Sequence, residues 1–347
     1  MAASCAIRRS RRVIFPVPSG IPAWGGHQVS FTSPISLSPQ LAIRKHDSFK
    51  RPQPCQGSDE GGSAQSVVCP VGPRVDDQRF GIFATTKRLA KGADDRSIAF
   101  AALREGDAKL IEQVYAKKFD AKANASGGSD AQQAVKELPF AVIIQASFVY
   151  AEGAEFVASL VKRAKGFKLV NEAFGKRPPV STAQVLHTEQ YLRNKRPEPV
   201  ALAPGAVLGD GWNSLKSETF GELEVLALLA FDKAQLQQYK GAAAGWAGGQ
   251  IELWRRGKFD PKACSAPCCE RDAAVLGLRW NDTKDAGEFE RALRSSLEKN
   301  QEAKLAGKGS FRVAGAGVAM SSSAKRTTVA YAPTPELAAK LAERAAK

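Results

Sequence analysis

Histidine is scarce in this sequence, and the residue patterns of the common catalytic motifs are missing. The three histidines are His27, His46 and His187. No Ser or Cys lies in a nucleophile-elbow context, and there is no Walker-type phosphate loop. Gly245, Gly248 and Gly249 lack the preceding strand and following helix of a dinucleotide-binding fingerprint. The sequence as written therefore predicts a protein that performs neither metal-dependent nor nucleophilic chemistry.

Long apolar runs are also missing. A membrane-spanning helix needs roughly 18 to 20 consecutive apolar residues. The most apolar stretch, residues 138–149, is shorter and contains Pro139, Gln145 and Ser147. We interpret it as a buried segment of a globular body, so no transmembrane span is predicted.

Cysteines are few, and half of them fall in one cluster. Cys264, Cys268 and Cys269 surround Pro267, whereas the other three lie in the first 75 residues. Structural zinc sites usually pair two short Cys/His motifs, and no second motif lies near this cluster. A loop disulfide or free thiols are therefore the favoured interpretations.

Basic residues outnumber acidic ones, which gives a formal charge of +15 and raises the question of an anionic partner. The basic residues are interleaved with acids, as where Lys340 and Arg344 alternate with Glu336 and Glu343. A nucleic-acid interface would gather them on one face with aromatic residues. A solvated basic surface is favoured over nucleic-acid binding, and the partner is left unknown.

Three regions differ in composition. Residues 1–75 are rich in Ser, Pro, Gly and Arg, have no acid before Asp47, and are predicted to be disordered or misannotated. An acid-poor start of this kind is typical of an organelle transit peptide, and a misread frame or wrong start is the alternative. Residues 76–203 are predicted to be a helical region, and residues 204–347 an α+β region packed on it.

The periodicity of apolar residues and the capping signals predict the elements of these regions. Helices are predicted at residues 94–119, 131–136, 142–165, 181–191, 219–231, 233–244 and 282–305, and from Pro335 onward. Strands are predicted at residues 250–254, 275–280, 311–320 and 327–331, and residues 195–204 form an extended link. The fold class is therefore α+β, with a helix-rich first part and an antiparallel sheet-and-helix second part.

Several phrases in this body are more specific than packing alone requires. They are Asp77-Gln78-Arg79-Phe80, Glu105-Gly106-Asp107-Ala108, Tyr150-Ala151-Glu152-Gly153-Ala154-Glu155, Ser181-Thr182-Ala183-Gln184-Val185-Leu186-His187 and Ala243-Ala244-Gly245-Trp246-Ala247-Gly248-Gly249. In this order, over residues 76–335, they resemble a largely uncharacterised family of bacterial secreted or lipid-anchored proteins of the zinc-peptidase type. The resemblance implies a zincin-like first part, an exported protein and a peptide or protein substrate.

The resemblance also implies a His-Glu-x-x-His helix that holds zinc, with its glutamate as general base. Glu105 would be the third ligand. Counting back from Asp77, however, the motif falls on residues 69–73, which read Cys-Pro-Val-Gly-Pro and can neither bind zinc nor form the helix. The chain is therefore predicted to be a metallopeptidase-like protein without its catalytic residues and without zinc. A mis-started gene product and a pseudoenzyme both fit, and a non-enzymatic binding or structural protein is the alternative.

Glu105, His187 and Glu152 each have a functional interpretation and a purely structural one. Glu105 is either a vestigial metal ligand or a partly exposed helix carboxylate. His187 either lines a cleft or is a structural histidine bonded to a neighbouring loop, and the second is favoured because one imidazole makes no site. Glu152 either lines the same cleft, paired with Glu155, or belongs to an acidic helix surface.

Overall fold

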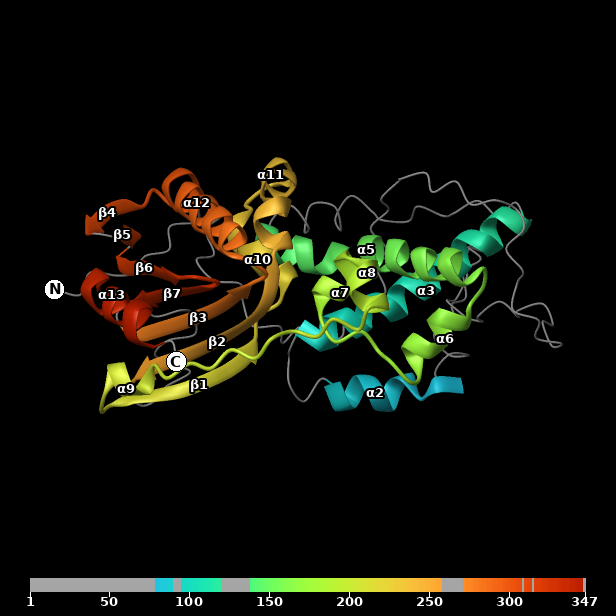
Figure 1. The fold of residues 1–347 in the computed structure, drawn as a ribbon, viewed down its shortest axis with the longest axis horizontal. Coiled ribbons are helices and arrows are strands. Elements are labelled where there is room, and N and C mark those ends of the chain that lie inside the picture. Colours follow the sequence, from blue (N-terminus) through green and yellow to red (C-terminus); the bar gives the residue numbers. More distant parts are fainter. Residues whose placement is uncertain are drawn as a thin grey trace, which may run out of the picture.

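The computed structural model describes residues 79–89, 95–119, 138–257, 271–307, 309–313 and 315–345. They form a helical part, residues 79–192, and a sheet part, residues 205–345, joined by an extended segment, residues 193–204 (Figure 1). The predicted α+β class is confirmed, because the sheet part contains a seven-stranded antiparallel sheet. The predictions for residues 1–75, for a helix at 131–136 and for the cysteine cluster lie outside the described residues.

Two long helices form the centre of the helical part. These are α3 (Asp95–Phe119) and α5 (Phe140–Ala164), which lie side by side in Figure 1. They cross where Gly106 meets Gly153, and a Cβ on Gly106 would overlap the carbonyl oxygen of Gly153. The shorter helices around them are α2 (Ile82–Leu89), α6 (Lys168–Phe174), α7 (Thr182–Leu186) and α8 (Thr188–Leu192). Both glycines belong to the sequence phrases that carry the family resemblance. Because a Cβ at either position would overlap the backbone of the other helix, close packing explains why glycine stands there.

Among the described residues, α5 is the one helix whose length and hydropathy match a membrane span. Ile144, Phe148 and Phe156 are buried on it, whereas Tyr150 is exposed. Its buried side faces α3 and the sheet part. The apolar stretch at residues 138–149 is thus the first half of a packed helix that runs to Ala164.

The strands of the sheet are β1 (Trp212–Thr219), β2 (Trp246–Arg256), β3 (Asp272–Trp280), β4 (Lys304–Gly307), β5 (Ser310–Val313), β6 (Ala316–Ser323) and β7 (Arg326–Ala332). Their order across the sheet is β1-β2-β3-β7-β6-β5-β4, and every neighbouring pair is antiparallel. The central strands are buried on both faces, because helices cover the sheet from two sides (Figure 1).

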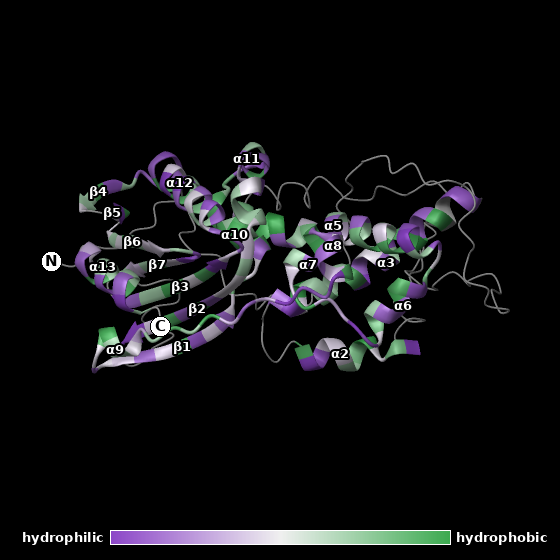
Figure 2. Ribbon diagram, in the orientation of Figure 1, coloured by the Kyte–Doolittle hydropathy of each residue, from purple (hydrophilic) through white to green (hydrophobic). Residues whose placement is uncertain are grey.

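Side-chain size differs between the two faces of the central strands, since successive residues point to opposite sides. Ala319 and Ala330 face α13 (Pro335–Arg344), and these short side chains let Leu341 of that helix pack close to the sheet. Larger residues such as Leu276 and Val329 point to the other face. That face is covered by α12 (Thr283–Asn300), which carries polar and apolar residues in Figure 2.

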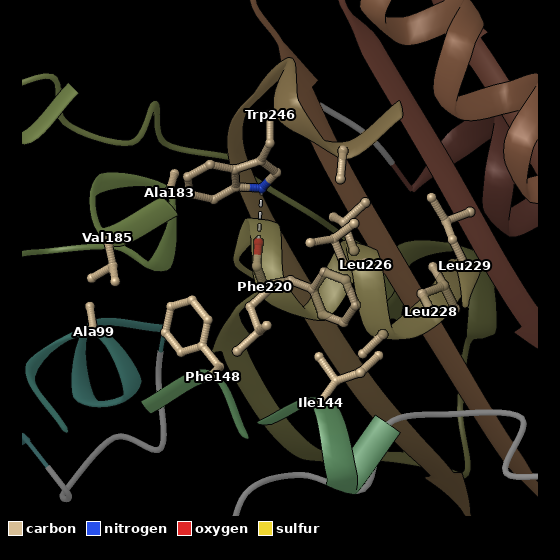
Figure 3. Close-up of a cluster of buried hydrophobic side chains, with 14 of the residues drawn as sticks. Ala99, Ile144, Phe148, Ala183, Val185, Phe220, Leu226, Leu228, Leu229 and Trp246 are labelled. Carbon is tan, nitrogen blue, oxygen red and sulfur yellow. Dashed lines mark hydrogen bonds between the residues drawn. The ribbon is translucent and has the colours of Figure 1, made fainter. Parts of the chain in front are cut away.

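One core runs through both parts, and α10 (Glu222–Leu229) lies at its centre. All eight residues of α10 are buried. Phe148 from α5 and Leu226 from α10 belong to the same cluster, in which the Trp246 indole donates a hydrogen bond to the Phe220 carbonyl at 3.0 Å (Figure 3). Two further helices complete the sheet part, α9 (Gly205–Leu208) and α11 (Lys233–Ala244). The two parts therefore meet through apolar packing, and polar groups surround this core.

Some predicted elements have other boundaries. The helix predicted at residues 181–191 is two helices, α7 and α8, which are separated at His187. The helix predicted from residue 219 begins at Glu222, because Thr219 ends β1, an exposed edge strand that the apolar pattern does not reveal. The helix predicted at 282–305 ends at Asn300, and the following residues form β4.

Glycines account for two further differences in the strands. The strand predicted at residues 250–254 is longer, because β2 begins at Trp246 and includes Gly248 and Gly249. At these two positions the carbonyl groups of Glu198 and Phe220 leave no room for a Cβ. Gly315 has a φ of 88° and splits the strand predicted at residues 311–320 into β5 and β6. A residue with this φ cannot continue a strand.

Candidate functional site

His187 owes its position to the break between α7 and α8. Ser181 begins α7, and its hydroxyl accepts a hydrogen bond from the Gln184 amide, as the sequence predicts. Both carboxylate oxygens of the buried Asp95, the first residue of α3, accept from the Thr182 amide at 3.0 Å. The helix then stops because His187 adopts φ −125° and ψ 82°. These anchors hold the imidazole at the junction of the two parts.

Glu222, the first residue of α10, is the partner of His187. The His187 Nε2 atom and the Glu222 Oε1 atom are 2.8 Å apart. The Glu222 side chain is only 2% exposed, whereas that of His187 is 35% exposed. A carboxylate at a helix N-terminus is stabilised by the helix dipole. The pair therefore connects a buried carboxylate of the sheet part to a half-exposed ring of the helical part.

The hydrogen bond to Glu222 raises the pKa of His187 above its usual range, and partial burial opposes this effect. Burial raises the pKa of Glu222, and the bond to His187 opposes that effect. Because the pKa of each group is raised in the folded protein, the pair binds a proton more tightly than the two separated groups would. The two groups therefore form a hydrogen-bonded pair whose proton affinity is raised by the fold.

Two lysines lie close enough to His187 for their charges to act on it. The charges of Lys195 and Lys240 both lower the pKa of His187, against the larger effect of Glu222. The ammonium group of Lys195 donates to the Asn281 side chain at 2.6 Å. Lys195 follows α8, and Lys240 lies on α11, so two separate parts of the chain bring lysines to this junction.

Glu152 belongs to the same neighbourhood. Burial raises its pKa, and the charge of Lys240 opposes this shift. Lys240 thus acts on both Glu152 and His187, the two residues that the sequence assigns to one cleft. Glu155 raises the pKa of Glu152 slightly, so the paired carboxylates sense each other. We call the set His187, Glu222, Lys195, Lys240 and Glu152 the junction cluster.

A small hollow lies beside the junction cluster. Ser181, Gln190, Lys195, Arg196 and Trp246 are among the residues that line it. It is a shallow surface depression, and two of its walls are cationic side chains.

Glu105 on α3 pairs with its own neighbour in the chain. Its Oε1 atom accepts from the Arg104 Nε and Nη2 atoms at 3.0 and 2.6 Å, and its side chain is 24% exposed. Its charge also raises the pKa of Tyr150 on α5, after burial. Within the described residues, no three His, Cys, Asp or Glu side chains gather as a metal site.

Sequence reasoning missed Glu222, Lys195 and Lys240. A capping signal in the sequence marks Glu222 as the first residue of α10. Gly221 is the N-cap, and the carboxylate of Glu224, three residues later, accepts a hydrogen bond from the Gly221 amide at 2.5 Å. The lysines carry no local signal, since their proximity to His187 depends on how α8, α10 and α11 pack.

The comparisons with known proteins concern the sheet part. The model of a family described as "Domain of unknown function (DUF8575)" matches residues 210–342, which is less than half of the chain. The match runs from β1 into α13 and contains Glu222 and Lys240, whereas His187, Glu152 and Lys195 lie before it. No curated protein and no solved structure matches the chain.

Proposed function

We propose that this chain is a non-enzymatic binding protein that takes an acidic side chain of a polypeptide partner at the junction cluster. The observation that carries the proposal is the 2.8 Å bond between His187 and the buried Glu222. This bond uses Nε2 and fixes the ring, which leaves Nδ1 to serve a ligand. When the ring is protonated, Nδ1 donates a hydrogen bond to a carboxylate.

The surrounding charges favour an anionic ligand. Lys195 and Lys240 are exposed and lie near His187, and Arg196 borders the adjoining hollow. Charge-assisted hydrogen bonds between such cations and a carboxylate are stronger than neutral ones. The net charge of +15 adds a long-range attraction for acidic partners.

The burial of the one aromatic residue named at the hollow, Trp246, favours a carboxylate over a nucleic acid as the ligand. Single-stranded nucleic acids bind through bases that stack on exposed aromatic faces. Trp246 is buried, and its indole nitrogen is already bonded to Phe220. A side-chain carboxylate needs hydrogen-bond donors but no stacking surface, and Lys195 and Arg196 supply such donors at the rim of the hollow.

The peptidase resemblance remains a second proposal, in which the chain is a metallopeptidase-like protein that lacks its zinc-binding residues. It rests on the sequence phrases quoted above and on the absence of the expected motif at residues 69–73. The two proposals agree that the chain as written does not hydrolyse peptides. They differ in what the scaffold now does, and only the first gives the junction cluster a role.

Anisotropy of a fluorescein-labelled 20-residue poly-glutamate peptide at pH 6.5 tests binding by the full chain. We expect the double variant Lys195→Ala, Lys240→Ala to bind about 5 to 30 times more weakly, since each exposed charge contributes about 0.5 to 1 kcal/mol. The control double variant Lys304→Ala, Lys340→Ala removes the same charge from exposed positions on β4 and α13. It should change the Kd less than twofold.

Two results would overturn the proposal. One is an equal loss of affinity in both double variants, because that would make the attraction a property of net charge alone. The other is that single-stranded DNA of matched length displaces the peptide and binds more tightly with a steep salt dependence. The second result would identify a nucleic-acid partner.

A further inference from the structure

Two polar contacts connect the helical part to the sheet part, and a third fixes α7, which makes one of these contacts, within the helical part. The first is the bond between the His187 Nε2 atom and the Glu222 Oε1 atom. The second is a buried bond in which the Leu223 amide of α10 donates to the Thr182 hydroxyl of α7 at 3.2 Å. The third is the bond from the Thr182 amide to Asp95, which fixes α7 on α3. His187 carries the only titratable imidazole among the described residues.

The first tie depends on protonation more than the other two. Glu222 is almost fully buried, and a buried carboxylate is stable only when a cation or hydrogen-bond donors compensate its charge. The protonated His187 ring supplies that cation. When the ring loses its proton, a neutral N–H can still donate to Glu222, but the buried negative charge loses its closest counter-charge.

Besides Glu222, two charged groups act on the ring, Lys195 after α8 and Lys240 on α11. Glu152 on α5 senses the same Lys240, and the buried Asp95 on α3 is bonded to the Thr182 amide. Lys195 and Lys240 both act against the protonated ring, and Lys195 also lowers the pKa of Glu222. Both lysines are exposed and lie in solvent, so they compensate the buried carboxylate less well than the imidazolium at 2.8 Å.

We propose that the His187–Glu222 pair is a pH-sensitive latch, which holds the helical part on the sheet part at neutral and acidic pH and loosens as the solution becomes alkaline. The latch goes beyond the proposed function, because it acts in the protein alone and needs no ligand.

The direction follows from the raised pKa of His187. A folded-state pKa above the usual value of 6.5 means that the closed junction binds a proton more tightly than the opened one. The stabilisation is therefore fully present below about pH 6.5 and is lost as the pH rises through the raised pKa. The raised pKa of Glu222 acts in the same direction, since ionising it in the closed junction is costly.

Native-state hydrogen exchange of the full chain, without any added ligand, tests the latch. The amides of Thr182 and Leu223 report on the junction. The Leu223 amide donates across it to the Thr182 hydroxyl, and the Thr182 amide donates beside it to Asp95. The Ala338 amide, which donates to the Thr334 carbonyl at the start of α13, is the control. After correction for intrinsic exchange rates, protection of Thr182 and Leu223 should fall between pH 6 and pH 8.5. The expected fall is about tenfold for each unit by which the pKa of His187 is raised.

The variant His187→Gln keeps a side-chain donor but its side chain does not titrate. The fall in protection at Thr182 and Leu223 should therefore be clearly smaller in this variant than in the natural sequence, because only Glu222 still titrates at the junction. Three results would overturn the latch: constant protection in the natural sequence, an equal fall in His187→Gln, or an equal fall at Ala338. If His187→Gln does not fold, the comparison of Leu223 with Ala338 in the natural sequence decides the question by itself. Failure of acidic-peptide binding would not affect this measurement.

Discussion

Gly106 of α3 lies directly against the backbone carbonyl of Gly153 of α5, so that neither position has space for a side chain. The two glycines belong to the Glu-Gly-Asp-Ala and Ala-Glu-Gly-Ala phrases that carry the peptidase resemblance. Their contact brings the axes of the two longest helices close together, and Glu152 of the junction cluster directly precedes Gly153 on α5.

Replacing Gly106 with alanine should destabilise the protein. The new Cβ would overlap the Gly153 carbonyl, which is backbone and cannot move aside cheaply. Overpacking of this kind costs about 1 to 3 kcal/mol. The measurement is the free energy of unfolding from urea titration, monitored by tryptophan fluorescence.

The matched control for that variant is Gly241→Ala. Gly241 lies in the middle of α11 with nothing within 4 Å of its would-be Cβ. Because alanine favours the helix, this change should stabilise the protein by about 0.5 to 1 kcal/mol. Equal effects of the two substitutions would show that the helix crossing is not tightly packed.

Asp95→Ala should cost about 1 to 3 kcal/mol, because it leaves the buried Thr182 amide without its acceptor. Asp210→Ala, at an exposed loop position, should change the free energy of unfolding by less than about 0.5 kcal/mol. Thermal or urea unfolding of both variants provides the comparison. If Asp95→Ala proves as stable as Asp210→Ala, α7 is not anchored on α3 in the way described.

Leu341→Ala should cost about 2 to 5 kcal/mol, since Leu341 is fully buried between α13 and the alanine-rich face of the sheet. The same substitution at Leu305, which is 69% exposed on β4, should have an effect near zero. Urea unfolding of the two variants separates the outcomes. A small effect at Leu341 would mean that α13 contributes little to the core.

Sequence periodicity predicts most elements because their apolar residues face a single core. The helices α3, α5, α11 and α12 and the strands β3 and β7 follow from such patterns, with capping at Ser181 and Pro335. The edge strand β1 was missed, because its side chains are mostly exposed and show no alternation.

The candidate site was less predictable than the fold. His187 and Glu152 were identified as residues of one cleft, and the charge of Lys240 does act on both. Glu222 is 35 residues away from His187 in the chain, so their pairing depends on tertiary packing. From the sequence, a structural histidine bonded to a neighbouring loop is the favoured interpretation of His187, and the bond goes to Glu222 on α10. The resemblance likewise directed attention to Glu105, whose closest partner is its own neighbour Arg104.

The most direct test of the junction cluster is an NMR titration of the His187 ring in the full chain, with and without poly-glutamate peptide. His187→Gln identifies its signal among those of the three histidines. The account predicts a pKa above the usual 6.5 in the free protein, and a further rise when the acidic peptide binds, because a bound carboxylate stabilises the protonated ring. A pKa at or below 6.5 that does not respond to the peptide would contradict both the bond to Glu222 and the proposed binding site.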